Sequence, residues 1–155
     1  MKSIVIRIII CVAMLVASIQ ANAQVKAFEK YADTKNVNYV FISKFMLRMA
    51  GASSAPSVPG VNTKSLMNKL NGIQIIASEN KNAIARLKAD AQAIVKQGKY
   101  ELLMQVDEDD QKVRIYHLEG KQQSAVVMMA DEDDEFTVIV FSGTFTLEDV
   151  MKMTE

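Results

Sequence analysis

The stretch that decides the fold is "YELLMQVDEDDQKVRIYHLEGKQQSAVVMMADEDDEFTVIVF", residues 100–141. Its apolar residues recur with a period of two in four segments, which the short polar turns DEDDQ, EGKQQ and DEDD separate. A period of two is typical of β-strands, and short connections make consecutive strands antiparallel neighbours. The stretch therefore predicts a four-stranded antiparallel meander over residues 100–106, 112–118, 124–130 and 135–141.

The residues outside the meander predict several helices and two more strands. The clearest helix covers residues 79–98, where an apolar stripe at helical spacing ends at a glycine. Residues 37–43 and 72–78 are rich in β-branched and aromatic residues, as strands are. Shorter helices are expected at residues 25–33, 44–50 and 63–71, and from Thr146 onward, where Asp149 completes a capping-box pattern.

These elements together predict the fold class. The connection from strand 72–78 through the long helix to strand 100–106 is expected to cross over right-handed, which places the helix on one face of the sheet. We therefore expect an α+β fold with a mainly antiparallel sheet of four to six strands. The sheet ends in the C-terminal meander, and the helices pack mostly on one face.

The first 23 residues have the features of a secretory signal peptide. Lys2 and Arg7 precede an apolar run of about a dozen residues, which is shorter than the ~20 needed to cross a bilayer. Ala21 and Ala23 then give the small-x-small pattern of a cleavage site. We therefore expect cleavage near Ala23, a mature chain without a membrane span, and a periplasmic or extracellular location.

The only cysteine, Cys11, lies inside the predicted signal peptide. The mature chain would therefore have no disulfide, no thiolate ligand and no cysteine nucleophile. Residues 24–155 are long enough to bury a core of their own. We expect them to form a single α+β domain with a flexible loop at residues 51–62, where small and polar residues without periodicity gather.

The charge balance excludes one class of partner. Loss of Lys2 and Arg7 leaves 16 of the 18 basic side chains against 18 acidic ones, without a basic stripe. Nucleic-acid binding depends on clustered lysine and arginine, so we expect no nucleic-acid partner. We also expect no cofactor, because the chain has no phosphate-binding loop and no cluster of histidines.

Two acidic clusters occupy the first and third turns of the meander, at residues 107–110 and 131–135. In a meander these turns emerge at the same end of the sheet, two strand spacings or roughly 10 Å apart. Carboxylate oxygens are the ligands that Ca²⁺ prefers. The candidate metal ligands are Asp107, Asp109, Asp110, Asp131, Asp133 and Asp134.

The spacing within these clusters does not match known acidic sites. Lys112 and Phe136 stand where the glycine of an EF-hand loop would be. Carboxylates on flexible turns also support nucleolytic or glycosidic chemistry poorly, because that chemistry needs a fixed separation. The competing interpretation is a pair of solvated hairpin turns, since charge runs are usually solvated.

His117 is the only histidine, so a Ser-His-Asp triad would have to include it. Ser53 and Ser54 do not lie in a G-x-S-x-G elbow. His117 alternates with Val113 and Ile115, which suggests a strand-end histidine that is either hydrogen-bonded or half exposed. We therefore assign no catalytic residue, and a hydrolase through His117 remains an alternative.

Residues 28–49, "FEKYADTKNVNYVFISKFMLRM", resemble the opening of a family of exported Bacteroidota proteins known only as a domain of unknown function. The shared patterns are F-x-K-Y-A-D, a Y-V-x-I-S-K junction and an M-L-x-M helix, and the later order of elements is also similar. The resemblance implies export, a role in the cell envelope and no established activity. Some relatives are lipoproteins, from which this chain departs because isoleucines precede Cys11.

The sequence thus predicts an exported, non-catalytic interaction module of the cell envelope, whose partner is another envelope protein. This prediction rests on the missing cysteine, the missing histidine cluster and the missing nucleophile motif. The alternatives are a divalent-cation site at the paired acidic turns and, less favoured, a hydrolase.

Overall fold

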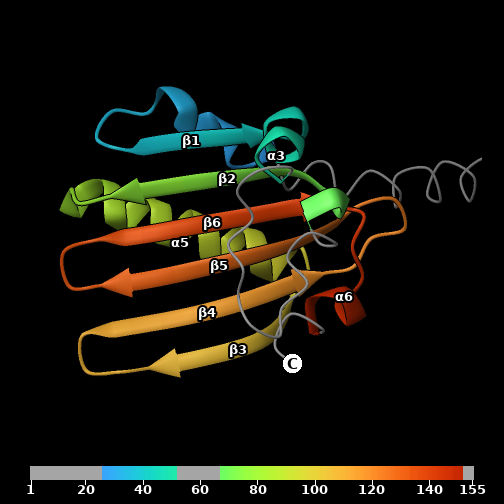
Figure 1. Cartoon of the computed structure of the whole chain (residues 1–155). Helices are drawn as coiled ribbons and strands as arrows, with labels where there is room; N and C mark the ends of the chain where they lie inside the picture. Colours follow the sequence, from blue (N-terminus) through green and yellow to red (C-terminus); the bar gives the residue numbers. More distant parts are fainter. Residues whose placement is uncertain (1–25, 52–66, 152–155) are drawn as a thin grey trace, which may run out of the picture.

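A six-stranded antiparallel sheet forms the centre of the molecule (Figure 1). The computed structural model describes residues 26–51 and 67–151. The strand order is β1-β2-β6-β5-β4-β3, and every neighbouring pair is antiparallel. The strands are β1 (Asn38–Ser43), β2 (Leu70–Ser78), β3 (Glu101–Asp107), β4 (Gln111–Leu118), β5 (Ser124–Glu132) and β6 (Phe136–Gly143). The predicted α+β fold and its C-terminal meander are therefore confirmed.

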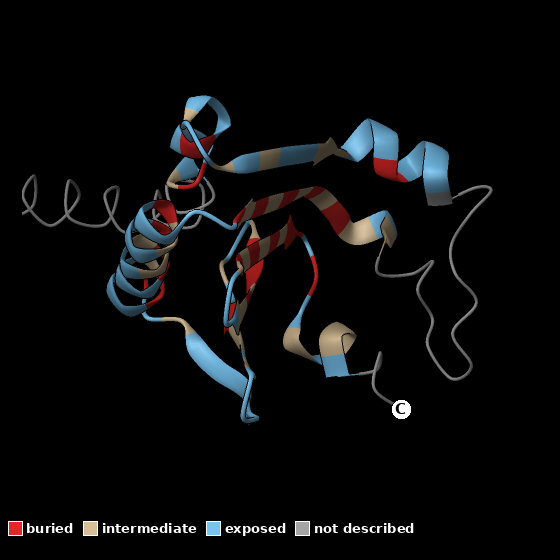
Figure 2. Ribbon diagram, turned by 90° about the vertical axis from the view of Figure 1, so that its left-hand side faces the viewer, coloured by how far each residue is buried: buried red, intermediate tan, exposed pale blue. Residues whose placement is uncertain are grey.

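The long helix α5 (Lys81–Gln97) connects β2 to the edge strand β3 and covers one face of the sheet, here called the back face (Figures 1 and 2). Its first turn is capped by Asn80, whose side-chain oxygen accepts hydrogen bonds from the backbone N–H groups of Asn82 and Ala83, both at 3.1 Å. The 3₁₀ helix η1 (Glu29–Asp33) lies on the same face. α5 is thus the predicted helix, on one face as expected.

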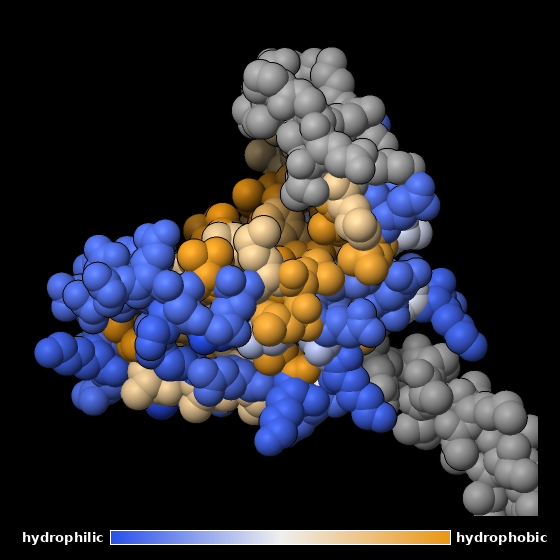
Figure 3. Space-filling view, turned by 90° about the horizontal axis from the view of Figure 1, so that it is seen from below, coloured by the Kyte–Doolittle hydropathy of each residue, from blue (hydrophilic) through white to orange (hydrophobic). Residues whose placement is uncertain are grey.

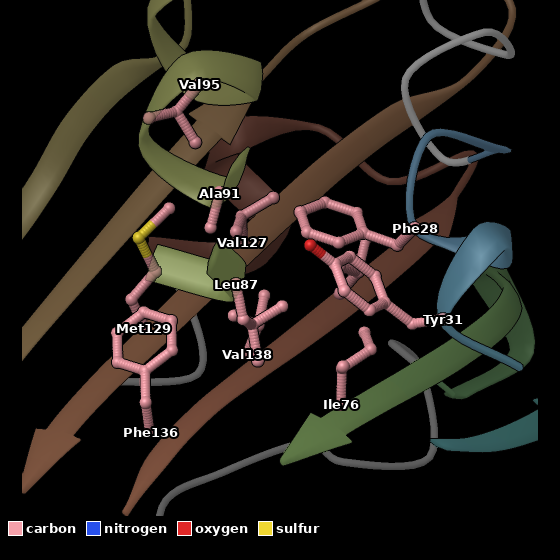
Figure 4. Packing of buried hydrophobic residues seen from close by; sticks show 11 residues of the cluster. Phe28, Tyr31, Ile76, Leu87, Ala91, Val95, Val127, Met129, Phe136 and Val138 are labelled. Atoms are coloured by element: carbon pink, nitrogen blue, oxygen red, sulfur yellow. The ribbon is translucent and has the colours of Figure 1, made fainter. Parts of the chain in front are cut away.

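The back face carries the main core (Figure 4). Leu87 of α5 is fully buried against Val138 of β6, Val127 of β5 and their neighbours. Phe28 and Tyr31 extend this cluster toward β2. The core consists of Phe28, Tyr31, Ile76, Leu87, Ala91, Val95, Val127, Met129, Phe136, Val138 and Val140. Burial of so many apolar side chains is the main source of stability of the fold.

The other face, here called the front face, has a smaller core at one end of the sheet. The short helices α3 (Lys44–Gly51) and α6 (Leu147–Met151) lie on this side (Figure 2). Leu47, Leu70, Val126 and Phe145 form its buried centre. A bulge between Leu70 and Gly72 turns Leu70 onto the front face, in line with this cluster.

The start of α6 follows the predicted capping box. The Thr146 backbone N–H donates to Asp149 Oδ2 at 2.8 Å, and the Asp149 backbone N–H donates to Thr146 Oγ1 at 3.3 Å. An ion pair of 2.7 Å between Lys69 and Asp149 ties the helix to the residue before β2. Nearby, a Cβ on Gly143 would lie 2.2 Å from the Lys69 carbonyl oxygen, so this close approach requires glycine.

Some predicted boundaries differ from the structure. The helix expected at residues 63–71 ends earlier, because β2 already begins at Leu70, which pairs with Gly143. The helix expected at residues 25–33 is a shorter 3₁₀ turn over its second half. The predicted signal peptide and residues 52–62 of the predicted loop lie outside the described residues. Within the described residues, no helix is both long and apolar enough to cross a membrane.

Candidate functional site

The two acidic turns lie at the same end of the sheet, as the meander predicts. Each is a tight hairpin: the Glu108 N–H donates to the Gln111 carbonyl at 2.8 Å, and the Glu132 N–H donates to the Glu135 carbonyl at 2.9 Å. The turns share an open depression of about 300 Å³. It is lined by Glu79, Asp110, Glu132, Asp133, Asp134 and Glu135.

The structure separates the predicted metal ligands into two groups. Asp107 pairs with Arg114 at 3.0 Å, and Asp131 pairs with Lys88 at 2.7 Å, so both carboxylates already have a cationic partner. Asp110, Asp133 and Asp134 line the depression, and Asp109 lies in the same turn as Asp110. Across residues 26–51 and 67–151, no group of three or more histidine, cysteine or carboxylate side chains is placed to hold a metal ion.

A continuous apolar row crosses the middle of the front face. Strand register aligns one residue from each of the six strands, and the side chains of directly paired residues lie on the same face. The row runs Val40, Ile75, Ile139, Met128, Ile115 and Met104. None of these side chains is buried, and Val40 and Met104 at the two ends are 50% and 49% exposed.

A second row lies beside the first, one pleat closer to the acidic turns, and its side chains are short. It comprises Ala77, Thr137, Ala130, Val113 and Val106, and on β1 it ends at the polar Asn38. None of them is buried. We call these two rows together the front strip.

Glutamates border the front strip on the side of the acidic turns. They continue the alternation of each strand by one further step, so they project from the front face. We call Glu79, Glu108, Glu132 and Glu135 together the acidic rim. Gln111 stands between them and donates to Glu132 Oε1 at 2.9 Å. In the described part of the chain, none of the four forms an ion pair.

On its other side the front strip meets the small front core. The next row contains Ile42, Ile73, Phe141 and Val126, which α3 and α6 help to cover. Among the described residues of the strip, Ile115 alone packs against a core cluster. The strip is therefore an apolar surface between two short helices and a line of carboxylates.

The bulge in β3 determines which of its side chains reach the strip. Leu102 pairs with Tyr116 and lies on the back face, whereas Met104 pairs with Ile115 and lies on the front face. The extra residue between them, Leu103, causes this switch. β3 forms one edge of the sheet. Figure 3 looks onto this edge and shows apolar surface in its middle, bordered by hydrophilic side chains. All residues of β3 are exposed.

His117 occupies the row covered by the front core and is 2% exposed. Its ring lies 6.4 Å from the ring of Phe145, and its Nε2 is buried without a hydrogen-bond partner. Burial lowers the pKa of His117, and the charges of Glu119 and Glu101 counter this only in part. The expectation of a hydrogen-bonded or half-exposed histidine was wrong, because the ring is buried and its Nε2 has no hydrogen-bond partner.

A buried neutral imidazole cannot act on a substrate that stays in solvent. Ser53 and Ser54, the serines considered for a triad, lie outside the described residues. The described structure thus gives the hydrolase alternative no assembled site.

The front strip was not predicted from the sequence, although one signal pointed to it. Both faces of residues 137–142 are apolar, which is typical of a strand covered on both sides. In residues 26–51 and 67–151, the core cluster of the back face contacts β6 along its whole length, whereas the core cluster of the front face contacts it only near Phe141. Detection of the full strip required the register of all six strands.

Comparison with known proteins identifies the family of the chain. Residues 31–153 match the family described as Domain of unknown function (DUF4252), so the chain belongs to that family. The resemblance to a domain-of-unknown-function family is therefore confirmed at this level. No curated protein and no solved structure matches the chain.

Proposed function

We propose that this member of the DUF4252 family is an exported, non-catalytic binding module of the cell envelope that docks another envelope protein on its front strip. The front strip itself carries the proposal. Exposed contiguous apolar surface is costly in a water-soluble domain and marks interaction sites. The strip crosses all six strands, and its rim of carboxylates gives it the polar border of a binding surface.

Export rests on the start of the chain, where a basic residue, an apolar run and the Ala21–Ala23 pattern precede the domain. Fractionation of cells followed by N-terminal sequencing tests it. The expected result is a mature protein that begins at Gln24 in the envelope or the medium. A protein that remains in the cytoplasm with Met1 or Lys2 at its start would contradict this part of the proposal.

The non-catalytic part rests on the chemistry of the candidate groups. His117 is enclosed and uncharged, and the carboxylates of the acidic turns stand on hairpins rather than on the walls of a rigid cleft. A binding role needs none of these groups to react.

The docking role is tested by site-specific photo-cross-linking in living cells. A photoreactive phenylalanine analogue replaces Met104 on the front face, and the matched control carries it at Leu102 on the back face. The two positions lie in one strand with exposures of 49% and 50%, so only the face differs. We expect a cross-linked adduct with an envelope protein from position 104 and none from position 102.

A second front-face position, Val40, lies at the far end of the same row. The photoreactive residue is also placed there, in case its presence at Met104 itself prevents docking. The absence of adducts from both Met104 and Val40 would contradict docking at the strip. Equal adducts from Leu102 would show contact without preference for a face.

A further inference from the structure

The shape and charge of the front strip identify the kind of segment that fits it. Resting on the binding function proposed above, we propose that the strip receives a single amphipathic helix of the partner protein. The apolar stripe of this helix lies on the strip, and its basic residues face the acidic rim.

The dimensions of the strip match one helix. Six strands have five spacings of about 4.8 Å, so the strip is about 24 Å long, and two rows of alternate residues make it about 13 Å wide. A helix with side chains is about 10–12 Å across and rises 1.5 Å per residue, so about 16 residues cover the strip. The sheet already accepts such an element: α5, with 17 residues, crosses the back face from β2 to β3.

The two rows of the strip differ in height. The row from Val40 to Met104 contains large aliphatic side chains, while the row from Ala77 to Val106 contains alanine, threonine and valine. The low row lies between the large aliphatic side chains and the glutamates of the rim. A helix axis over the low row would contact the large apolar side chains with one flank and the carboxylates with the other.

The charges of this end of the molecule distinguish its two faces. Asp107 and Asp131, which lie on the back face, are paired with Arg114 and Lys88. The rim glutamates on the front face form no ion pair in the described part of the chain. Glu132 and Glu135 accept hydrogen bonds only from the neutral side chains of Gln111 and Thr137 in the described structure. Lysine or arginine along one flank of a docked helix supplies the missing charge.

Other occupants fit less well. A second copy of the chain would bring another flat sheet against a strip flanked by α3 and α6. An anionic lipid surface would meet the acidic rim with like charge. Strand addition at β3 is opposed by the bulge at Leu103, which interrupts the edge.

Two synthetic peptides of about 16 residues test the proposal. Both carry the same leucine stripe, and one has lysines along a flank of the stripe where the other has glutamates. They are titrated into the exported protein as purified from cells, and the side-chain methyl groups are observed by NMR. Met128 and Met129 are adjacent but lie on opposite faces, so each serves as the control of the other.

The proposal predicts that the lysine peptide shifts the methyl signals of Met128, Ile139 and Ile75 and leaves those of Met129 and Ile76 in place. Met104→Asp should weaken binding at least about tenfold, whereas Leu102→Asp should change it by less than about twofold. Val40→Asp repeats the test at the opposite edge if Met104→Asp unfolds the protein.

The combined variant Glu132→Gln and Glu135→Gln addresses the charge. It should remove most of the preference for the lysine peptide over the glutamate peptide at low salt, while the methyl shifts stay on the front face. A preference that survives this variant would overturn the role of the rim.

The remaining outcomes are equally decisive. The helix proposal is overturned if neither peptide binds, if the shifted methyl groups lie on the back face, or if Leu102→Asp is as damaging as Met104→Asp. Sedimentation that shows a dimer lost on Met104→Asp would assign the strip to a second copy instead. In each of these cases a cross-link from Met104 to an envelope protein would leave the docking function standing, so the two proposals can fail separately.

Discussion

The two faces of the sheet have similar apolar character but differ in how they are covered. In β6, Phe136, Val138 and Val140 point to the back face and are at most 2% exposed. Ile139 and Phe141 alternate with them on the front face and remain partly accessible. Among the described residues, one long helix covers the back face, and the helices on the front face are short and lie at one end. Strand composition alone therefore does not tell which face is fully covered and which one stays partly accessible.

The largest expected effect comes from the covered face. Leu87→Ala should lower the free energy of unfolding by about 2–5 kcal/mol, because Leu87 is fully buried and a cavity remains in the back core. Ile139→Ala on the front strip should lower it by only about 1 kcal/mol, since the side chain is already partly solvated. Urea unfolding monitored by circular dichroism measures both.

Equal losses of unfolding free energy in Leu87→Ala and Ile139→Ala would contradict the difference between the two faces. They would mean that the front strip is as well packed as the back core in solution.

The second effect concerns the closed end of the front face. Burial lowers the pKa of His117 in the folded protein, whereas the unfolded chain has the ordinary value near 6.5. Below that value the unfolded state binds the proton more readily, so stability should fall as the pH drops from about 7 toward 5. His117→Leu, which does not titrate, should flatten this part of the curve of unfolding free energy against pH.

Acidic side chains titrate in the wild type and in His117→Leu alike. Their contribution therefore cancels when one curve of unfolding free energy against pH is subtracted from the other. An unchanged slope in His117→Leu would show that the ring is charged or exposed in the folded state, contrary to its place beneath Phe145.

A smaller and more local effect is expected at α6. The Lys69 ammonium, together with the backbone N–H and hydroxyl of Thr146, lowers the pKa of Asp149 to about 2. A carboxylate with a depressed pKa stabilises the folded state above its unfolded value near 3.9 and loses that contribution as the pH falls toward 2. The protection factors of the α6 amides against hydrogen exchange should therefore fall as the pH drops toward 2.

Asp149→Asn should show those lower protection factors already at neutral pH and little further change in acid. The protection factors of α5, which is capped by the uncharged Asn80, provide the internal reference. A parallel fall of protection in α5 and α6 would indicate global unfolding rather than release of the α6 cap.

The smallest effect is expected from Ca²⁺ at the paired acidic turns. We expect no heat in calorimetry and no shift in melting temperature at millimolar Ca²⁺, because solvated carboxylates on hairpins do not form a rigid set of ligands. A site half-filled at that concentration would add about 0.4 kcal/mol. A shift that disappears in Asp133→Asn with Asp134→Asn, but not in Asp109→Asn, would establish a cation site.

Local patterns in the sequence predicted much of this fold. The period of two predicted the meander, the apolar stripe predicted α5, and Thr146 with Asp149 predicted the cap of α6. Each of these signals depends on residues a few positions apart, whose geometry the backbone fixes. Membership of a domain family of unknown function was likewise predicted, and the match over residues 31–153 confirms it.

The front strip could not be found in the same way. Its rows exist only because strands far apart in sequence pair in one register, and a single added residue at Leu103 decides that Met104 lies on the front face. His117 is buried in a region that also contains Phe145, which lies 28 positions later in the sequence. Such features belong to tertiary packing, for which a single sequence has no short-range signal.

The bulge at Leu103 also affects how the protein behaves at high concentration. An edge strand with the composition of β3 is a template on which other chains can add and begin to aggregate. The bulge breaks the even spacing of the backbone donors and acceptors, and Lys99, with a φ of 55°, bends the chain just before the strand. The edge of the sheet can thus stay apolar while the backbone of β3 is a poor template for the growth of fibrils.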